Sequence, residues 1–218
     1  MTPSDENPLG YINTSAMKLE NSPLKFYASQ GPLENTTIDF WAMIYKCKIP
    51  TIIMLTNYCE LGVQKCHEYL PKTKLKILDG VYIVFDEVKK NVDTMTITKL
   101  HFEFKNTRRN ITHIVFKKWE DKEVPSNEDF NIIINEVRSL VQKSSIKKIC
   151  VHCSAGAGRT GVLICILYVL MVQIPNEFIN IDGTIADMRL CRSQMVQTSQ
   201  QYRFIHLFII QRLDELID

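Results

Sequence analysis

A cysteine, an arginine and two glycines lie within seven positions of one another, between Cys153 and Arg159. The segment around them runs from a short apolar, β-prone stretch through a glycine-rich turn into an apolar sequence of helical composition. A strand, a tight loop and a helix N-terminus in this order form a cradle for anions, because loop N–H groups and the positive end of the helix dipole converge. We expect Cys153 at the mouth of this cradle. His152, the N–H groups and the helix terminus would favour its thiolate, a nucleophile at neutral pH.

The other side chains of this segment suit a tetrahedral anion. Arg159 can curl back over the loop and hold two oxygens with a planar fork that lysine lacks. Gly156 and Gly158 let the backbone approach the anion, and Thr160 brings a hydroxyl near the sulfur. The spacing therefore predicts a phosphate ester as ligand. A buried structural cysteine beside a helix cap is the alternative, but it does not account for all these residues at these offsets.

The ten residues from His152 to Gly161 closely resemble the H-C-S-A-G-x-G-R-S/T-G signature of the tyrosine-specific protein phosphatases. The resemblance implies a phosphotyrosine hydrolase with a phosphocysteine intermediate and no cofactor. It also implies an α/β fold: one domain with a highly twisted mixed β-sheet flanked by helices, and the catalytic loop between a strand and a helix N-terminus. His152 would support a phosphate-binding loop that comprises Ser154, Ala155, Gly156, Ala157, Gly158 and Arg159.

A second block, from Phe116 to Pro125, resembles the mobile acid loop of the family, W-P-D-x-G-V-P. The match gives Asp121 the role of general acid, with Trp119 as a supporting residue. Glu120 replaces the usual proline and Glu123 the usual glycine, so we expect altered open and closed populations of the loop. The two added carboxylates should raise the pKa of Asp121 and help it hold a proton for the leaving oxygen. A charged surface turn is the alternative interpretation.

A third block, over residues 189–202, resembles the family pattern R-x-x-R-x-x-M-V-Q-T-x-x-Q-Y. By this resemblance Gln197 and Gln201 position a water molecule, and Arg189 supports the site. A spacing of four residues places both amides on one face of a helix, which suits a shared water. Two glutamines at the start of a helix are otherwise unremarkable.

The resemblance and the residue types together predict a two-step cycle. Cys153 attacks phosphorus while Asp121 protonates the departing phenolic oxygen, and Arg159 with the loop amides stabilises the transferring phosphoryl group. Asp121 then activates the water that cleaves the phosphocysteine. Thr160 would stabilise the departing thiolate.

Composition restricts the class of protein. The 218 residues suffice for one well-buried domain, and 26 basic against 24 acidic residues point to neither nucleic acid nor a membrane surface. The longest apolar run, over residues 162–172, is short for a bilayer, which needs roughly 20 residues. Seven cysteines without framework spacing, and the need for a free thiolate, predict a reducing cytoplasmic location. We expect a monomer that acts on tyrosine-phosphorylated proteins.

Two cysteine-based alternatives are weaker. Cys59, Cys66 and His67 lie close in sequence, but their spacing matches no common zinc pattern, so we predict no metal site. Cys150 and Cys153 have the C-x-x-C spacing of redox motifs, and a regulatory disulfide stays open, although the two thiols would leave a strand in different directions.

The resemblance extends from Tyr11 to Leu213. We expect residues 1–10 to be a poorly ordered tail and residues 11–218 to be the catalytic domain. The K-N-R-Y segment that sets pocket depth in the family, and the helices around it, do not stand before Tyr11. A phosphotyrosine-binding pseudophosphatase and a phosphatase of broader specificity therefore stay open as alternatives. The altered acid loop also gives a resemblance to phosphatases carried by parasitoid-wasp bracoviruses, which would imply a viral, host-directed protein.

Periodicity predicts the supporting elements. Helical spacing of apolar residues favours helices that end before Pro50, over residues 127–144, from about residue 180, and towards the C-terminus. Residues 51–55 are expected to form a central strand, and alternating apolar residues between 72 and 116 predict several antiparallel strands.

Overall fold

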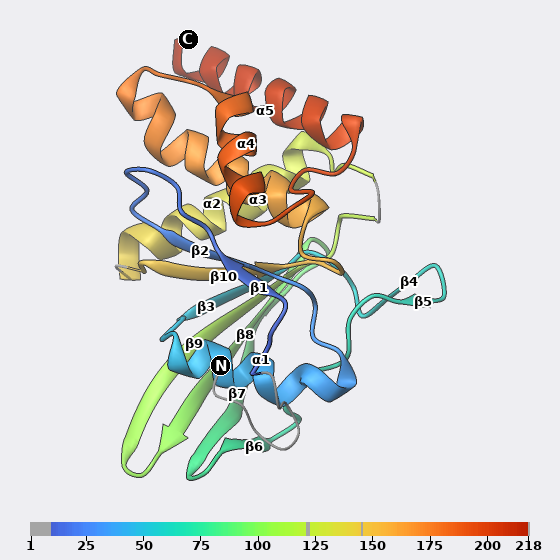
Figure 1. The fold of residues 1–218 in the computed structure, drawn as a ribbon, viewed down its shortest axis with the longest axis vertical. Coiled ribbons are helices and arrows are strands. Elements are labelled where there is room, and N and C mark those ends of the chain that lie inside the picture. Colours follow the sequence, from blue (N-terminus) through green and yellow to red (C-terminus); the bar gives the residue numbers. More distant parts are fainter. Residues whose placement is uncertain (1–9, 121–122, 145, 218) are drawn as a thin grey trace.

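The computed structural model describes residues 10–120, 123–144 and 146–217. Within these residues, eight strands form one mixed sheet in the order β1-β2-β10-β3-β9-β8-β7-β6, and two short strands form a separate hairpin. The main sheet contains β1 (Thr14–Ala16), β2 (Lys25–Ser29), β3 (Thr51–Met54), β6 (Lys74–Leu78), β7 (Val81–Asn91), β8 (Met95–Phe104), β9 (Thr107–Phe116) and β10 (Lys148–His152). The hairpin consists of β4 (Cys59–Glu60) and β5 (Val63–Gln64), and it projects from the body of the domain (Figure 1).

The four central strands β2, β10, β3 and β9 run parallel. Apolar and β-branched residues fill β3 and most of β10, and both strands are buried on both faces, as parallel strands require. Cys150 of β10 is the register partner of both Tyr27 on β2 and Ile52 on β3. Because β10 and β3 end at the same edge, the loop after His152 leaves the sheet at its centre.

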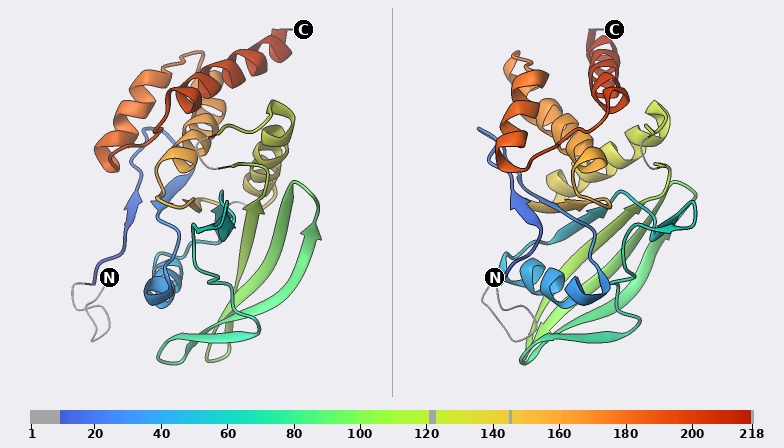
Figure 2. Two further views of the ribbon diagram at one scale, coloured as in Figure 1. Left: turned by 90° about the vertical axis from the view of Figure 1, so that its right-hand side faces the viewer. Right: turned by 45° about the vertical axis from the view of Figure 1, so that its right-hand side comes forward.

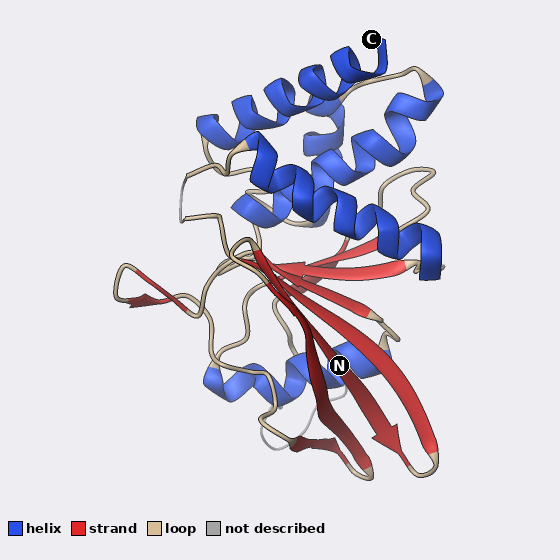
Figure 3. Ribbon diagram, turned by 180° about the vertical axis from the view of Figure 1, so that it is seen from behind, coloured by secondary structure: helices blue, strands red, loops and turns tan. Residues whose placement is uncertain are grey.

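The outer strands β6 to β9 are antiparallel, as their alternating sequence predicts. Strands β7, β8 and β9 are long and strongly twisted, and their far ends curve away from β2, β10 and β3 (Figures 2 and 3). Irregular register in β7 between Phe85 and Glu87, and again between Val88 and Lys90, adds to this twist. The predicted mixed and twisted sheet is confirmed.

Helices cover both faces of the sheet. Helix α1 (Thr37–Lys46) lies on one face, and α2 (Asn127–Ser144), α3 (Gly158–Tyr168), α4 (Ile181–Cys191) and α5 (Ser199–Ile217) lie on the other (Figure 1). Polar caps begin two of them: Ser126 Oγ accepts from the N–H of Asp129 at 3.1 Å, and Asn180 Oδ1 accepts from that of Gly183 at 2.8 Å. Two short 3-10 helices, η1 (Glu34–Thr36) and η3 (Ile174–Asn176), and a π-helical segment, η2 (Val169–Gln173), complete the described helical segments.

Two hydrophobic cores result, one on each face. The core beneath α1 contains Phe40, Trp41, Ile52, Tyr69, Phe102 and Cys150. The core beneath the other helices contains Phe116, Trp119, Phe130, Cys153, Val162, Leu163 and Phe208. The catalytic loop therefore begins where the chain passes between the two cores.

Helix α3 continues through η2 and η3 as one apolar stretch. By length and composition, this stretch of the described chain, Gly158–Asn176, could cross a membrane, but 83% of its most apolar window is buried inside the domain. The core helix of a globular domain has this same composition. The stretch exceeds the apolar run seen in the sequence because the helix continues beyond Tyr168 with different hydrogen bonding.

Candidate active site

The loop between β10 and α3 requires glycine at two positions. Gly156 has a φ of +67°, and an added Cβ would lie 2.0 Å from the carbonyl oxygen of Ser29. An added Cβ at Gly158 would lie 2.8 Å from Oε1 of Gln197 and 3.0 Å from the side-chain amide of Gln201. The missing side chains therefore let the loop turn tightly and let both glutamines reach it.

Arg192 holds this loop from outside. Its Nε donates to the carbonyl oxygen of Gly156 at 2.7 Å, and its Nη2 donates to that of Ala155 at 2.9 Å. The same Nη2 donates to Oδ1 of Asn13 at 2.7 Å, which ties the guanidinium to the segment before β1. In a planar trans peptide the C=O and N–H point in opposite directions, so carbonyls held outward leave N–H groups facing inward. This is the geometry of an anion cradle.

Arg159 is 2% exposed and makes a bidentate ion pair with Glu60 of the β4–β5 hairpin. Nη1 lies 2.7 Å from Oε1 of Glu60, and Nη2 lies 2.7 Å from Oε2. Nη1 also donates to the carbonyl oxygens of Leu55 and Trp119, at 2.9 and 2.8 Å. The planar guanidinium is thereby fixed at the edge of the cradle.

The carboxylate of Glu60 is itself held by several donors. Burial tends to raise its pKa, but the hydrogen bonds from Arg159 and from the N–H of Asn57 outweigh burial and keep the pKa below its ordinary value. The Asn57 N–H lies 3.0 Å and the Thr56 hydroxyl 2.8 Å from Oε1 of Glu60. Glu60 is therefore charged at neutral pH and keeps Arg159 in one orientation.

One pocket brings together most of the predicted site residues. Its volume is about 230 Å³, and it is lined by Lys65, Cys153, Ser154, Ala155, Arg159, Gln197, Thr198 and Gln201. Oε1 of Gln201 accepts from the backbone N–H of Gln197 at 2.9 Å, which ties the Gln201 side chain to the turn that carries Gln197. The hydroxyl of Thr160 is buried and has no hydrogen-bond partner within the described part of the chain. A thiol, a fixed cation and two amides thus face one small volume.

Arg189 lies behind the glutamines. Its Nε and Nη2 donate to the carbonyl oxygens of Met195 and Val196, each at 2.9 Å. Val196 has a φ of +61°, a strained conformation for a β-branched residue. Arg189 therefore stabilises the strained turn that delivers Gln197 to the pocket.

His152 is fully buried, and burial lowers its pKa to about 4. The ring is therefore neutral at neutral pH. Its Nε2 lies 2.7 Å from the hydroxyl of Tyr69, and its Nδ1 lies 3.2 Å from the carbonyl oxygen of Cys153. The sequence led us to expect that His152 favours the thiolate. In the structure it carries no positive charge and contacts the cysteine through the backbone.

The family model of protein-tyrosine phosphatases matches residues 1–211. The chain belongs to the protein-tyrosine phosphatase family. It is 34% identical to human tyrosine-protein phosphatase non-receptor type 12, in a match that covers 98% of this chain and 28% of the relative. It is 35% identical to mouse tyrosine-protein phosphatase non-receptor type 20, in a match that covers 96% of this chain and 51% of the relative. The chain thus spans about a quarter to a half of these curated relatives.

Solved structures of PTPN18 have the same fold. One, concerned with the fingerprint of PTPN18 on distinct HER2 tyrosine phosphorylation sites, is 31% identical, with a TM-score of 0.81 over 93% of this chain and 73% of that chain. Another is of PTPN18 in complex with HER2 phosphopeptides, with the same TM-score of 0.81; the match covers 92% of this chain and 71% of that chain.

The acid loop of this phosphatase-family domain is described only at its two ends. Trp119 is 1% exposed and packs edge-on against Phe116 and Phe130, at ring-centroid distances of 6.4 and 5.5 Å. Its Nε1 donates to the carbonyl oxygen of Glu123 at 2.8 Å. Asp121 lies outside the described residues, so its predicted position and raised pKa stay predictions. The ends of the loop are anchored to the core and to Arg159.

The C-x-x-C pair of this domain does not form a disulfide in the structure. All seven cysteines are free. Cys150 belongs to the core beneath α1, whereas Cys153 belongs to the core on the opposite face, and burial raises the pKa of Cys150. Alternation along β10 causes this separation. The regulatory disulfide is therefore not supported.

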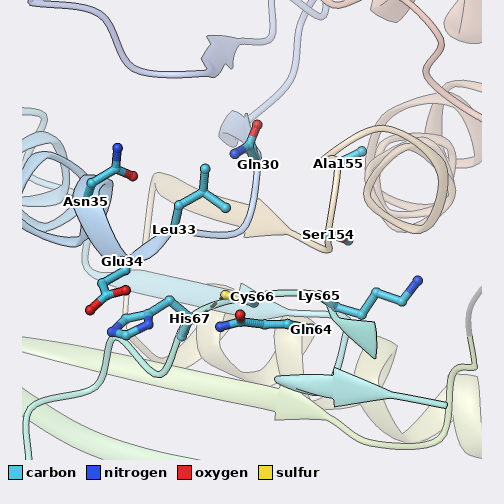
Figure 4. Close-up of a pocket in the computed structure, with 10 residues that line it drawn as sticks. All are labelled: Gln30, Leu33, Glu34, Asn35, Gln64, Lys65, Cys66, His67, Ser154 and Ala155. Carbon is cyan, nitrogen blue, oxygen red and sulfur yellow. Dashed lines mark hydrogen bonds between the residues drawn. The ribbon is translucent and has the colours of Figure 1, made fainter. Parts of the chain in front are cut away.

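A larger pocket of about 610 Å³ adjoins the catalytic pocket and shares Lys65, Ser154 and Ala155 with it. Figure 4 shows the segment from Gln30 to Asn35 on one side of this pocket and the segment from Gln64 to His67 on another. In the same view Lys65 extends away from Glu34 and His67. A peptide bound at Cys153 could extend into this space.

Glu60, Arg192 and Tyr69 are the site residues to which sequence reasoning gave no role. Each comes from a segment distant from Cys153 in sequence, and none carries a local spacing signal of its own. Arg192 does lie in the block over residues 189–202 that resembles the family, which was the signal available for it.

Proposed function

We propose that this protein hydrolyses phosphotyrosine in proteins through a phosphocysteine on Cys153. The observation that carries the proposal is the pocket in which Cys153, Arg159 and the two glutamines meet. Its small volume and the fixed guanidinium of Arg159 suit one phosphate monoester. The names of the similar tyrosine-protein phosphatases and the PTPN18 complexes with phosphopeptides support the same substrate class.

In the first step the thiolate of Cys153 forms a bond to phosphorus as the bond from phosphorus to the phenolic oxygen breaks. Asp121 gives its proton to that oxygen, and Arg159 with the loop amides stabilises charge on the phosphoryl oxygens. In the second step a water held by Gln197 and Gln201 attacks phosphorus and passes its proton to Asp121. The sulfur leaves as thiolate near the hydroxyl of Thr160.

Tyrosine-phosphorylated proteins are the proposed partners, and residues that flank the phosphotyrosine would occupy the larger pocket beside Lys65 (Figure 4). The monomeric state, the cytoplasmic location and the lack of a nucleic-acid or membrane partner are proposed from the balanced charge and the free cysteines. A viral, host-directed role stays a prediction from the altered acid loop.

Turnover of matched phosphotyrosine and phosphoserine peptides tests this function. We expect turnover of phosphotyrosine only, its loss in Cys153→Ser, and a fall of roughly 10²- to 10⁴-fold in Asp121→Ala, the usual contribution of a general acid. Equal rates on both peptides would favour the broader phosphatase. Binding without turnover by the unmodified protein would favour the pseudophosphatase.

A further inference from the structure

Three buried side chains form a continuous hydrogen-bonded chain beneath the catalytic loop. The hydroxyl of Tyr69 lies 2.5 Å from Nε2 of His113 and 2.7 Å from Nε2 of His152. The histidines come from β9 and β10, on either side of β3, where His113 pairs with Ile52 and His152 with Met54. All three side chains are at most 1% exposed, so no water competes for these contacts.

The direction in which these three side chains donate their hydrogen bonds follows from the contact that His152 makes with the catalytic loop. Nδ1 of His152 lies 3.2 Å from the carbonyl oxygen of Cys153, and a carbonyl only accepts hydrogen bonds. Nδ1 therefore carries the proton. Because the ring is neutral, its Nε2 is an acceptor, and the single hydroxyl proton of Tyr69 is donated to it.

The role of His113 follows in turn. The hydroxyl of Tyr69 gives its only proton to His152, so its oxygen can only accept a hydrogen bond from His113. The ring proton of His113 must therefore be on Nε2. Burial lowers the pKa of His113 to about 3, so Nδ1 is a bare lone pair. Nδ1 of His113 is indeed buried without a hydrogen-bond partner among the described residues. The reverse direction would leave a buried N–H there, and a lone pair against the carbonyl of Cys153, both of which are costly.

The series of hydrogen bonds ends at the peptide bond between Cys153 and Ser154. An added Cβ at Gly31 would lie 2.7 Å from the carbonyl oxygen of Cys153, so this oxygen packs closely against the Gly31 backbone. The N–H of Gly31 also donates to the carbonyl oxygen of Ser154 at 2.9 Å. The peptide is trans and planar, so the N–H of Ser154 points away from the carbonyl that His152 holds. Ser154 itself lines the catalytic pocket.

We propose that His113 is a positioning residue: by donating to Tyr69 it keeps the hydroxyl proton of Tyr69 on His152, which reinforces the His152 tautomer that holds the Cys153 carbonyl and so orients the Ser154 N–H for phosphate. His113 touches no substrate and acts from two strands away. The inference rests on the proposed function of Cys153 as nucleophile. It predicts that a hydrogen-bond donor at position 113, rather than bulk alone, controls the reactivity of Cys153.

The test is the pH dependence of Cys153 alkylation by iodoacetamide, followed by mass spectrometry of the peptide that contains Cys153. His113→Leu removes the donor, whereas His113→Gln keeps an N–H that can reach Tyr69. We expect His113→Leu to move the half-maximal alkylation rate upward by roughly 0.5 to 1 pH unit, the size of one hydrogen bond, and His113→Gln to restore it. Alkylation needs no phosphatase turnover, so failure of the proposed function would be seen separately.

Ile111→Val is the matched control. Ile111 lies on the same face of β9 as His113 and is 1% exposed, but it takes no part in the hydrogen bonds between His113, Tyr69 and His152. It should lower stability without moving the alkylation profile. Tyr69→Phe should move the profile as His113→Leu does, and the double variant should move it no further. If His113→Leu does not fold, Tyr69→Phe and His113→Gln decide the matter alone. An unmoved profile in Tyr69→Phe or His113→Leu, or an equal shift in Ile111→Val, would overturn the proposal.

Discussion

The guanidinium of Arg159 is held in one orientation by protein groups at the edge of the catalytic loop. Two hydrogen bonds of 2.7 Å to Glu60 and two more to backbone carbonyls fix the plane of its guanidinium. A cation fixed in this way loses little conformational entropy when the substrate binds. Glu60 is therefore as much a part of the cradle as the loop that binds phosphate.

Replacement of Glu60 by glutamine should weaken both the site and the fold. Glu60→Gln keeps one acceptor but leaves Arg159 without its counter-charge, so we expect kcat/KM to fall roughly tenfold and the free energy of unfolding by about 1–3 kcal/mol. The pKa of Glu60 is lowered in the folded protein, so its stabilisation is complete at neutral pH and is lost as the pH falls through that lowered pKa. Denaturant unfolding at several pH values measures this.

The difference in unfolding free energy between the two proteins should therefore shrink below about pH 4. Glu103→Gln is the matched control, because Glu103 also contacts a cation, Lys74, but on the exposed outer sheet. It should leave kcat/KM unchanged. A loss of activity in Glu103→Gln as large as in Glu60→Gln would contradict a specific role for the buried pair.

Elements that follow one another in the sequence could be predicted, whereas contacts between residues far apart in the sequence could not. Strand β10, its glycine-rich loop and α3 follow one another, so the motif contained its own geometry. Glu60 is 99 residues from Arg159 and reaches it from a two-stranded hairpin whose short strands carry almost no alternation signal. Tyr69 likewise contacts His152 across 83 residues. These contacts are made by a hairpin and a loop outside the main sheet, so no local pattern in the sequence indicates them.

The acid loop is the element whose sequence departs most from the family pattern. We expect Asp121→Asn to remove the basic limb of the kcat profile, because the leaving oxygen then lacks a proton donor. Glu123→Gln should keep both limbs and move the basic limb to lower pH, since one neighbouring carboxylate is gone. The hydrogen bond from Trp119 is to the backbone carbonyl of Glu123, so this control preserves the anchor of the loop. An unchanged basic limb in Asp121→Asn would exclude Asp121 as the acid.

For the whole molecule, period-2 and helical patterns predicted the antiparallel strands and most helices. The parallel core could not be derived from them, because β2, β10 and β3 are neighbours in space but not in sequence. The extension of α3 to Asn176 was also missed, since a π-helical segment, Val169–Gln173, and a 3-10 turn, Ile174–Asn176, carry the helix past the end of the apolar run at residue 172. The resemblance to the family supplied the topology that local patterns lacked.

The arrangement of the domain concentrates its chemistry at one edge of the sheet. The ends of β10 and β3, the start of α3 and the start of α5 converge there, and β9 ends at Phe116, just before Trp119. Because two separate cores anchor Cys150 and Cys153, the loop is fixed on both sides of the sheet. The nucleophile therefore sits on a rigid base.

Rapid quenching of a reaction with a ³²P-labelled phosphotyrosine peptide tests the role of Cys153 most directly. Gln201→Ala should slow the second step by roughly 10- to 100-fold, because the attacking water is no longer held in place, and so let the intermediate accumulate. We predict covalent label on the peptide that contains Cys153, and no label in Cys153→Ser. Product formation without covalent label, or label on another residue, would contradict the account.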